Sequence, residues 1–417
     1  SATAIFATTA WGENWPQWRG PRGNGISAET DLPVTWSPDK NVAWRLPMPG
    51  PAGATPVVWE DRIFVSTVDD GMLALVCVST DGKQLWKKTV AKGNKNVRGD
   101  EGNYASPTPV TDGEHVWVFF GQGTVACFDF DGNEIWKKDL QSAYGKFEIQ
   151  FGLSSTPVLF GNNLYFQLIH GKWSSEPSRG TIVALDKTSG KEVWKTLRLT
   201  DAINENKHSY ASPVLYDHGE LQYLVTHGAD YVVAYDLEDG SEIWRCGNLN
   251  PKSNYNDTLR LVASPATAPG LIVVPSAKGG PVLGLKADLE GNVTEDKSAM
   301  QWMMERGTPD VPTPLIHDGL VYLCRENGNL ICLDAQTGEK IYEERTVAER
   351  HRASPVYADG HIYLTARNSG TVTVVKAGRD FEIVSKNSLG EAISASPAIS
   401  NGRIYLRSFD ALYAIDK

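Results

Sequence analysis

The chain has 417 residues, more than the roughly 250–300 residues at which a single hydrophobic core stops growing, so it contains several domains or a modular array. Hydrophobic residues make up 41% and charged residues 22% of it, without a long charge run, and this composition excludes a disordered chain. The formal net charge is −10, from 50 acidic and 40 basic residues, which argues against sequence-independent binding to phosphate backbones. We therefore expect no nucleic acid among its partners.

The first 40 residues show no pattern of a globular domain. Residues 1–10, SATAIFATTA, are small, apolar and uncharged, which is typical of the end of a secretory signal peptide cleaved after Ala10. This pattern predicts a periplasmic or secreted protein. Residues 11–40 are rich in Pro, Gly and Trp, and we expect them to form an ordered strap on the rim of the following fold. No stretch approaches the ~20 apolar residues of a membrane helix, so no transmembrane segment is expected.

Residues 41–417 contain a repeat of eight units. Each unit opens with a strand after a proline, continues with a β-rich second strand and a third strand ending in a phrase such as IVALD, and closes with an apolar-aromatic pair such as Val193-Trp194. The prolines that open the units are Pro56, Pro107, Pro157, Pro213, Pro265, Pro314, Pro355 and Pro397. Four strands in each of eight units predict an all-β fold, a single eight-bladed β-propeller of four-stranded antiparallel blades.

The eighth unit, from Ala395 to Lys417, contains only three strands. Its missing fourth strand has a match at the other end of the chain, because residues 41–47, NVAWRLP, have the form of the last phrase of a unit, as in GKEVWKTL. We expect this segment to pair in the last blade and close the ring, which covers an otherwise unpaired edge. The repeated Trp, with the Gly four residues before it, is expected to dock one blade on the next as part of the core.

Several phrases of the chain resemble a known family. ALDKTSGKEVW and its copies resemble the tryptophan-docking repeat of the PQQ-like (pyrroloquinoline quinone-like) β-propellers. NWPQWRGPRGNG, LPVTWS, NVAWRLPMPG and ATPVVWEDRIFV are similar to the N-terminus of the secreted PQQ-like repeat proteins of environmental bacteria. The resemblance covers residues 14–417 and implies the propeller fold. It leaves function open, because the family includes quinone-dependent dehydrogenases and non-enzymatic assembly scaffolds.

Propeller geometry predicts which loops carry function. The first strand of each blade lines the axial channel, and the loop that enters it lies on the same face as the turn between strands two and three. We therefore expect functional side chains just before each first strand and just after each second strand. Four histidines fall at turns of the opposite face and are expected to be turn residues only: His115, His218, His317 and His361.

Histidines concentrate on the predicted functional face at units three and four. His170 and His227 end equivalent second strands, and His208 and Tyr210 lie on the loop entering unit four. Three imidazoles could bind a divalent metal, or His208 could act as a general base with Tyr210 as the acid. The alternative is a polar rim without a ligand. A long insertion in unit three carries Trp173, which is expected to project over the channel mouth and could stack on a sugar or a flat ring.

Basic residues concentrate on the same face at units six to eight. Arg325, Arg367 and Arg407 fall near second-strand ends, and His351 and Arg352 lie on the loop entering unit seven. Arginine forks pair with carboxylate, sulfate or phosphate groups, so these residues predict an anionic ligand at the mouth. The alternative is that they pair with neighbouring acidic side chains.

The sequence thus favours a secreted or periplasmic binding or scaffold propeller, expected to be a monomer, with a small-molecule, carbohydrate or protein ligand at the channel mouth. One alternative is a PQQ-dependent quinoprotein dehydrogenase, but the five cysteines include no adjacent pair and no calcium-binding group of acids is recognisable, so neither PQQ nor calcium is favoured. The other is a propeller-type polysaccharide lyase using His208, Tyr210 and an arginine. Whether the chain catalyses any reaction, and which ligand it binds, stay open at this stage.

Overall fold

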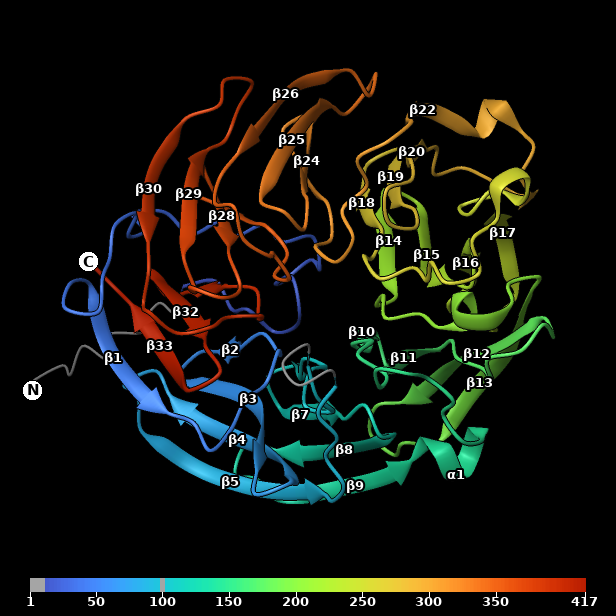
Figure 1. Ribbon diagram of the computed structural model, residues 1–417. Helices are drawn as coiled ribbons and strands as arrows, with labels where there is room; N and C mark the ends of the chain where they lie inside the picture. The colour runs from blue at the N-terminus through green and yellow to red at the C-terminus, as the bar shows by residue number, and fades with distance from the viewer. Residues whose placement is uncertain (1–11, 98–101) are drawn as a thin grey trace, which may run out of the picture.

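The computed structural model describes residues 12–97 and 102–417. Eight antiparallel sheets stand around a central axis in chain order (Figure 1), which confirms the predicted eight-bladed propeller. The predicted signal-peptide remnant, residues 1–10, lies outside the described residues. Within them, no helix is long and apolar enough to cross a membrane.

The blades contain the following strands. Blades one to four are formed by β2 (Val57–Trp59), β3 (Arg62–Asp69), β4 (Met72–Ser79) and β5 (Gln84–Ala91); β6 (Val110–Thr111), β7 (His115–Phe119), β8 (Thr124–Asp129) and β9 (Glu134–Asp139); β10 (Val158–Phe160), β11 (Asn163–Leu168), β12 (Ser178–Asp186) and β13 (Glu192–Thr200); β14 (Val214–His218), β15 (Leu221–Gly228), β16 (Tyr231–Tyr235) and β17 (Glu242–Cys246). Blades five to eight are formed by β18 (Ala266–Ala268), β19 (Leu271–Pro275), β20 (Val282–Leu285) and β22 (Met300–Met304); β23 (Leu315–His317), β24 (Leu320–Cys324), β25 (Asn329–Asp334) and β26 (Lys340–Arg345); β27 (Val356–Ala358), β28 (His361–Thr365), β29 (Val372–Lys376) and β30 (Ile383–Asn387); β31 (Ala398–Ser400), β32 (Arg403–Arg407), β33 (Ala411–Ile415) and β1 (Val42–Pro47). Three short helices connect blades: α1 (Leu140–Tyr144), η1 (Asn204–Lys207) and η2 (Lys252–Asn254). A fourth, η3 (Lys297–Ala299), lies within blade five, before β22.

Burial within a blade changes from the axis to the circumference. The middle strands are buried on both faces, as in β3 and β4, because each is sandwiched between the neighbouring blades. The outermost strands alternate between half-buried and exposed positions, as in β1. This difference explains why the second and third strands of each unit are near-continuous apolar runs in the sequence.

The N-terminal strand closes the ring as predicted. Strand β1 pairs antiparallel with β33, with Val42 opposite Ile415 and Leu46 opposite Leu412. The first blade and the last blade therefore lie side by side next to the β1–β33 pair (Figure 1). Trp44 of this strand packs on Gly82 of blade one, and its indole N–H donates to the Thr80 carbonyl at 2.8 Å.

Five of the eight blade junctions use this tryptophan contact. In each, the indole packs against a glycine of the next blade, where an added Cβ would come within 3 Å of the ring, and the indole N–H donates to a carbonyl of that blade at 2.8–3.0 Å. The pairs are Trp44 with Gly82, Trp86 with Gly132, Trp136 with Gly190, Trp194 with Gly240, and Trp302 with Gly338. The docking glycine therefore belongs to the following blade, in the turn before its own outermost strand.

A ring of hydroxyl groups lines the axial channel. At the start of blades one to seven, a backbone N–H donates to the Ser or Thr hydroxyl at the equivalent position of the next blade, in seven links of 2.8–3.2 Å. The residues of this hydroxyl ring are Thr55, Thr108, Thr156, Ser212, Ser264, Thr313, Ser354 and Ser396. Unit two therefore opens at Thr108-Pro109. The prediction of Pro107 was wrong because the segment ASPTP offers two hydroxyl-proline steps, of which only the second joins the ring.

The strap crosses the face opposite the predicted mouth. Trp15 exchanges backbone hydrogen bonds with Val58 in blade one, and Trp18 lines the far end of the axial channel. The buried Arg19 guanidinium donates to the carbonyls of Pro314 and Pro355, in blades six and seven, at 2.9 and 3.4 Å. The strap thus spans the ring and does not stay on the rim as predicted, because its buried arginine finds carbonyl acceptors on the far blades.

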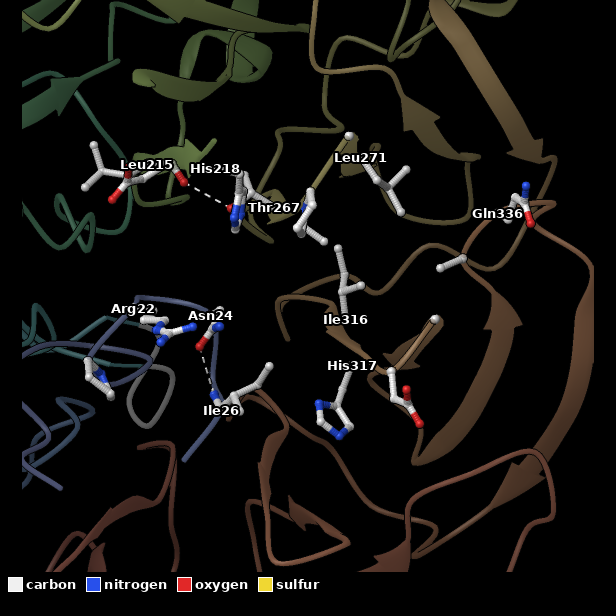
Figure 2. Close-up of a pocket in the computed structure, with 18 of the residues that line it drawn as sticks. Arg22, Asn24, Ile26, Leu215, His218, Thr267, Leu271, Ile316, His317 and Gln336 are labelled. Carbon is white, nitrogen blue, oxygen red and sulfur yellow. Dashed lines mark hydrogen bonds between the residues drawn. The ribbon is translucent and has the colours of Figure 1, made fainter. Parts of the chain in front are cut away.

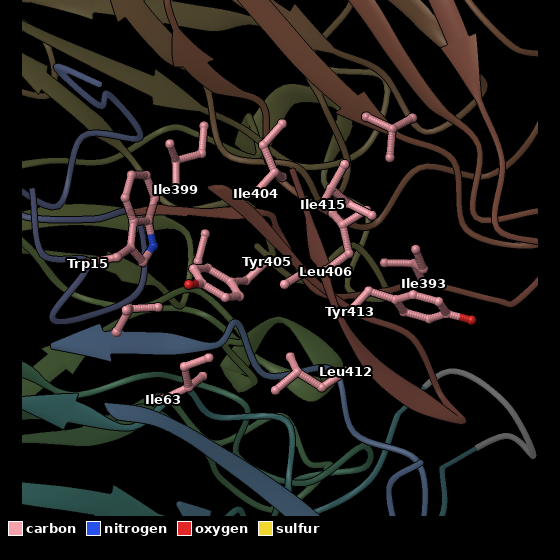
Figure 3. Close-up of a cluster of buried hydrophobic side chains, with 14 of the residues drawn as sticks. Trp15, Ile63, Ile393, Ile399, Ile404, Tyr405, Leu406, Leu412, Tyr413 and Ile415 are labelled. Atoms are coloured by element: carbon pink, nitrogen blue, oxygen red, sulfur yellow. The ribbon is translucent and has the colours of Figure 1, made fainter. Parts of the chain in front are cut away.

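The strap also contributes to the largest buried cluster around the ring closure. Trp15 and Trp36 pack there with apolar side chains of blades one, seven and eight, including Ile404 and Leu412 (Figure 3). The backbone N–H of Trp36 donates to Asn387 Oδ1 at 3.0 Å, and its ring stacks on Tyr363. Trp15, Leu32, Trp36 and Met48 of this N-terminal segment are therefore part of the core of the propeller.

All five cysteines are buried free thiols. Burial raises the pKa of the Cys77 and Cys324 thiols to about 12, so neither forms a thiolate near neutral pH.

Candidate functional site

The mouth of the axial channel holds a cavity of about 440 Å³ on the face where functional loops were expected. It adjoins the hydroxyl-lined channel, sharing Ser106, Ser154 and Tyr210 with it. Among the described residues, its charged lining comprises four basic and two acidic side chains: Arg260, Lys278, Arg350, Arg352, Asp310 and Glu326. The mouth cavity therefore has an excess of cationic side chains in a chain whose net charge is −10.

Arg260 forms one wall of the mouth cavity together with two aromatic rings. Its guanidinium lies 5.3 Å from the ring centroid of Phe151 and 6.0 Å from that of Tyr210, which is cation–π geometry. Glu205, at 3.2 Å from the guanidinium, forms a salt bridge with it. The two rings themselves are 5.7 Å apart. These contacts hold a cation and a pair of aromatic faces in fixed positions at the mouth.

A network of opposite charges forms the other wall. Lys278 Nζ lies 2.9 Å from Glu326 Oε2 and 3.6 Å from Asp310 Oδ2, and Arg352 Nη1 donates to Glu326 Oε1 at 3.0 Å. Burial by itself raises the pKa of Glu326, but the Lys278 hydrogen bond and the Arg352 charge outweigh it and lower this pKa to about 2. Burial raises the pKa of Asp310, against the opposing charge of Lys278. Glu326 is therefore the stronger acid of the pair.

The histidines singled out in the sequence do not form a metal centre. His227 is fully buried and its Nδ1 contacts the Ala263 carbonyl at 2.9 Å, and His208 Nε2 contacts the Gly171 carbonyl at 2.9 Å. His170 Nδ1 accepts the Glu148 N–H at 3.3 Å. No group of three or more His, Cys, Asp or Glu among the described residues is placed to hold a metal ion. In each of the three imidazoles one ring nitrogen already contacts a backbone group, so these rings serve loop and blade contacts.

The proposed acid–base pair is also divided. Tyr210 lines the mouth cavity, whereas His208 is buried and is not among the residues lining that cavity. Burial lowers the pKa of His208 and lowers that of His170 to about 4, so both rings are neutral at pH 7. A lyase mechanism that needs His208 beside Tyr210 at the mouth has no support in this arrangement.

The arginines predicted as ligands divide into exposed and buried groups. Arg352 lines the mouth cavity, and Arg325 lines an adjoining cavity of about 670 Å³ and lies 3.3 Å from Glu343. Arg407 is fully buried and donates to the Gly50 carbonyl at 2.5 Å, and burial lowers its pKa to about 10. Arg367 is buried below the Phe409 ring at 5.2 Å. The last two are thus interblade contacts, because their side chains point between blades.

His351 and Trp173, also predicted as ligand-binding residues, do not line the mouth cavity. His351 is fully buried, with Nδ1 at 3.0 Å from the Glu349 carbonyl, so it shapes the loop that presents Arg350 and Arg352. Trp173 is 55% exposed but is not among the residues lining the mouth cavity.

Sequence reasoning missed Arg260 and Lys278. Arg260 lies four residues before the Ser264-Pro265 step, and Lys278 follows the second strand of unit five. Both positions obey the same loop rule that pointed to Arg352 and Arg325. The loop rule could therefore have identified them. They do not stand out in the sequence because polar residues and glycines surround the charged residues of unit five.

The chain was compared with known proteins. Residues 74–196 and 131–380 match the family described as outer membrane protein assembly factor BamB, which is built from PQQ-like repeats. The chain belongs to this family of PQQ-like propellers. Among curated relatives of the family, the assembly factor BamB of Moranella endobia is 25% identical over 305 residues, covering 70% of this chain and 69% of its own length. A polyvinylalcohol dehydrogenase of a Pseudomonas species is 24% identical over 241 residues, covering 50% of this chain and 36% of its own length.

Solved structures of similar fold include members of both functional types. BamB from Moraxella catarrhalis superposes with a TM-score of 0.61 at 15% identity, covering 90% of this chain and 97% of its own. Quinohemoprotein alcohol dehydrogenase from Comamonas testosteroni superposes with a TM-score of 0.69 at 13% identity, covering 97% and 81%. At these identities the likeness shows the fold alone.

The mouth cavity was tested against the quinone cofactor that some relatives imply. PQQ is a flat tricarboxylate whose site combines cations and aromatic faces with a calcium ion bridging to acids. The cations and aromatic rings are present, but Asp310 and Glu326 are both within reach of Lys278, and no metal-binding group of acids is formed by the described residues. The described donor set does not fit a calcium-bridged quinone.

Proposed function

We propose that this chain is a periplasmic or secreted binding propeller that holds a carboxylate-bearing ligand at the mouth of its axial channel. The observation that carries the proposal is the charge of the mouth cavity, which is lined by four basic and two acidic side chains among the described residues. Arginine forks bind carboxylates in bidentate fashion and are less strongly hydrated than lysine, so a cavity edged by Arg260, Arg350 and Arg352 favours an anion. The aromatic pair Phe151 and Tyr210 gives the apolar part of such a ligand a surface.

The ligand that we favour is an acidic segment of a partner protein. Relatives in this family are named as assembly factors, which supports a role in binding proteins. The cavity volume of about 440 Å³ lies in the lower part of the ~300–1,000 Å³ range of ligand pockets, which suits a few side chains of such a segment. Binding of this kind needs no catalytic group.

The test is fluorescence anisotropy with a fluorescein-labelled hexaglutamate peptide, against a labelled hexaserine peptide. We expect the acidic peptide alone to bind, and its affinity to fall as salt is raised from about 50 to 200 mM. Arg260→Ala should weaken binding by about tenfold or more, which corresponds to ~1.4 kcal/mol. The matched control is Arg62→Ala, which removes the same charge on blade one, away from the mouth cavity. Equal affinity of the two variants would contradict the proposal.

A quinone-dependent dehydrogenase is the second candidate, supported by the polyvinylalcohol dehydrogenase relative and by the arginines and aromatic rings of the mouth. Because the acids do not form a calcium site, we expect no tight PQQ binding and no dye-linked alcohol oxidation after reconstitution with PQQ and calcium. A submicromolar PQQ titration with robust turnover would replace the binding role by this one.

A further inference from the structure

The face opposite the mouth carries a larger cavity, of about 1,150 Å³. It is lined by the turns between the first and second strands of blades three to six, by later turns of blades six and seven that carry Asp334 and Arg379, and by the strap loop, residues 17–26 (Figure 2). We name it the strap cavity. His218 and His317, which the sequence predicted to be turn residues only, both line it. The mouth cavity shares no lining residue with it, so the two are separate sites.

The strap wall is held rigidly against the blades. Arg19 donates to the carbonyls of Asn24 and Pro314 at 2.8 and 2.9 Å, and Tyr357 of blade seven exchanges backbone hydrogen bonds with Gly25 and Ser27. Gly25 has a positive φ of 80°, and a Cβ there would lie 2.7 Å from the Arg19 guanidinium. The loop between Arg19 and Gly25 therefore presents Arg22 and Asn24 to the strap cavity at fixed positions.

Polar side chains from separate elements face this cavity with unused hydrogen-bonding capacity. In the part of the chain that the structure describes, the side chains of Gln17, Arg22, His218 and His317 make no hydrogen bond or ion pair. Burial lowers the pKa of both His218 and His317, so each imidazole is neutral at pH 7 and offers one donor and one acceptor. Gln17 likewise offers both. The cavity therefore presents paired donors and acceptors.

Charge distinguishes the strap cavity from the mouth cavity. Its basic residues, Arg22 and Arg379, are outnumbered by Asp217, Asp318 and Asp334, and Arg379 lies 3.1 Å from Asp334. An anion is therefore not favoured. The polar groups alternate with apolar surface, which is formed by Leu159, Phe160, Leu215, Leu271 and Ile316.

We propose that the strap cavity is a second binding site of this propeller, for a neutral oligosaccharide. A sugar ring has hydroxyl groups that both donate and accept hydrogen bonds on its edge and apolar C–H groups on its faces. These two features match the neutral imidazoles and carboxamides and the intervening aliphatic side chains. The volume exceeds the ~300–1,000 Å³ typical of a small-molecule pocket, so the site has room for a chain of several rings.

The experiment is isothermal titration of the full chain with chitohexaose and cellohexaose, with saturation-transfer NMR to identify the bound rings. Hexagalacturonate and an uncharged hexapeptide serve as the anionic and peptide probes. We expect at least one neutral hexasaccharide to bind, and the double variant Arg22→Ala/His218→Ala to weaken it by about tenfold or more. Melting curves of each variant show whether the fold is retained. If the double variant does not fold, Gln17→Ala, which removes one donor and acceptor, should still weaken binding.

The mouth variant Arg260→Ala separates this site from the proposed function. It should leave hexasaccharide affinity unchanged while it weakens hexaglutamate binding, so either proposal can fail without the other. Lack of binding by both neutral hexasaccharides at millimolar concentration would overturn the inference. Tighter binding of the hexapeptide, or equal loss in Arg260→Ala and in the double variant, would overturn it too.

Discussion

The eight junctions between blades are held in two different ways. Five use a tryptophan that packs on a glycine of the next blade and donates its indole N–H to a carbonyl there. The other three depart from this contact. Between blades four and five, β21 (Gly291–Asn292) reaches back from blade five to pair in parallel with β17 beside Trp244. Between blades six and seven, Tyr342 meets Phe381 edge-on at 5.5 Å.

The third irregular junction, between blades seven and eight, has no aromatic residue in the outermost strand β30. The strap takes its place, with Trp36 on Tyr363 and the Val34 carbonyl accepting a hydrogen bond from Asn387 at 3.0 Å. The comparison shows that a repeat protein can lose its repeated contact where an insertion or a terminal segment covers the same surface. At these irregular junctions, deletion of the covering segment or protonation of a buried histidine should change the stability of the ring.

Removal of the strap and the closing strand should have the largest effect. Deleting residues 1–48 removes Trp15, Trp36 and Trp44 from the core and exposes the edge of β33, so cooperative folding should be lost. Calorimetry and hydrogen exchange measure this, and a peptide of residues 12–48 added in trans should partly restore the transition. A truncated chain that melts like the full-length one contradicts this reading of the junction.

One aromatic side chain should contribute more to the free energy of unfolding at a regular junction than at an irregular one. Trp194→Ala removes a buried ring and its hydrogen bond to Leu237, and we expect a loss of about 3–5 kcal/mol in the free energy of unfolding. Phe381→Ala should cost less, about 1–3 kcal/mol, because Phe381 is only partly buried. Urea unfolding checks both, with the exposed Trp173→Ala as the matched control within about 0.5 kcal/mol of wild type. If Phe381→Ala lowers the free energy of unfolding more than Trp194→Ala does, the tryptophan contact is not the stronger of the two junctions.

The smallest effect concerns pH at the junction of blades four and five, where His227 contacts the Ala263 carbonyl. Burial lowers the pKa of His227 to about 3, below the ordinary value of about 6.5, so in acid the unfolded state binds a proton that the folded state excludes. Its contribution to stability is complete above about pH 6.5 and is lost as the pH falls towards 3, with a slope of up to ~1.4 kcal/mol per pH unit. Urea unfolding of the wild type and His227→Gln from pH 7 to 5 should converge. Parallel curves would show that another group governs acid sensitivity.

The fold could be predicted from the sequence because the repeat carries it. The last unit has only three strands after Ala395, and a fourth-strand phrase stands around Trp44. The N-terminal strand must therefore complete the last blade, and the pairing of β1 with β33 confirms this. The opening of unit two could not be assigned, since Pro107 and Pro109 both follow a hydroxyl residue and only the backbone path selects Thr108. The path of the strap was also missed, because residues 11–40 have no period and their contacts depend on where Arg19 finds carbonyls.

The sequence predicted the face and the loops that form the candidate site better than it predicted the residues that line it. The loop rule placed Arg352 at the mouth, where it lines the cavity. It could not separate Arg325, which lines the adjoining cavity, from Arg407. Both stand at the end of an apolar second strand, and only the strand register decides that Arg407 points between blades. The loop rule could not predict the strap cavity, because one of its walls comes from a segment outside the repeat.

The hydroxyl ring has a consequence for how such chains change in length. In each inner link, one residue supplies both groups, as Thr108 does when its hydroxyl accepts from Thr55 and its N–H donates to Thr156. A duplicated blade would therefore bring its own donor and its own acceptor, and a lost blade would take both away. No buried polar group is orphaned by either event, whereas a conventional hydrogen-bond pair split between two blades would leave one partner behind. Blade number can thus vary by gene duplication or deletion at little polar cost, with closure limited by ring geometry alone.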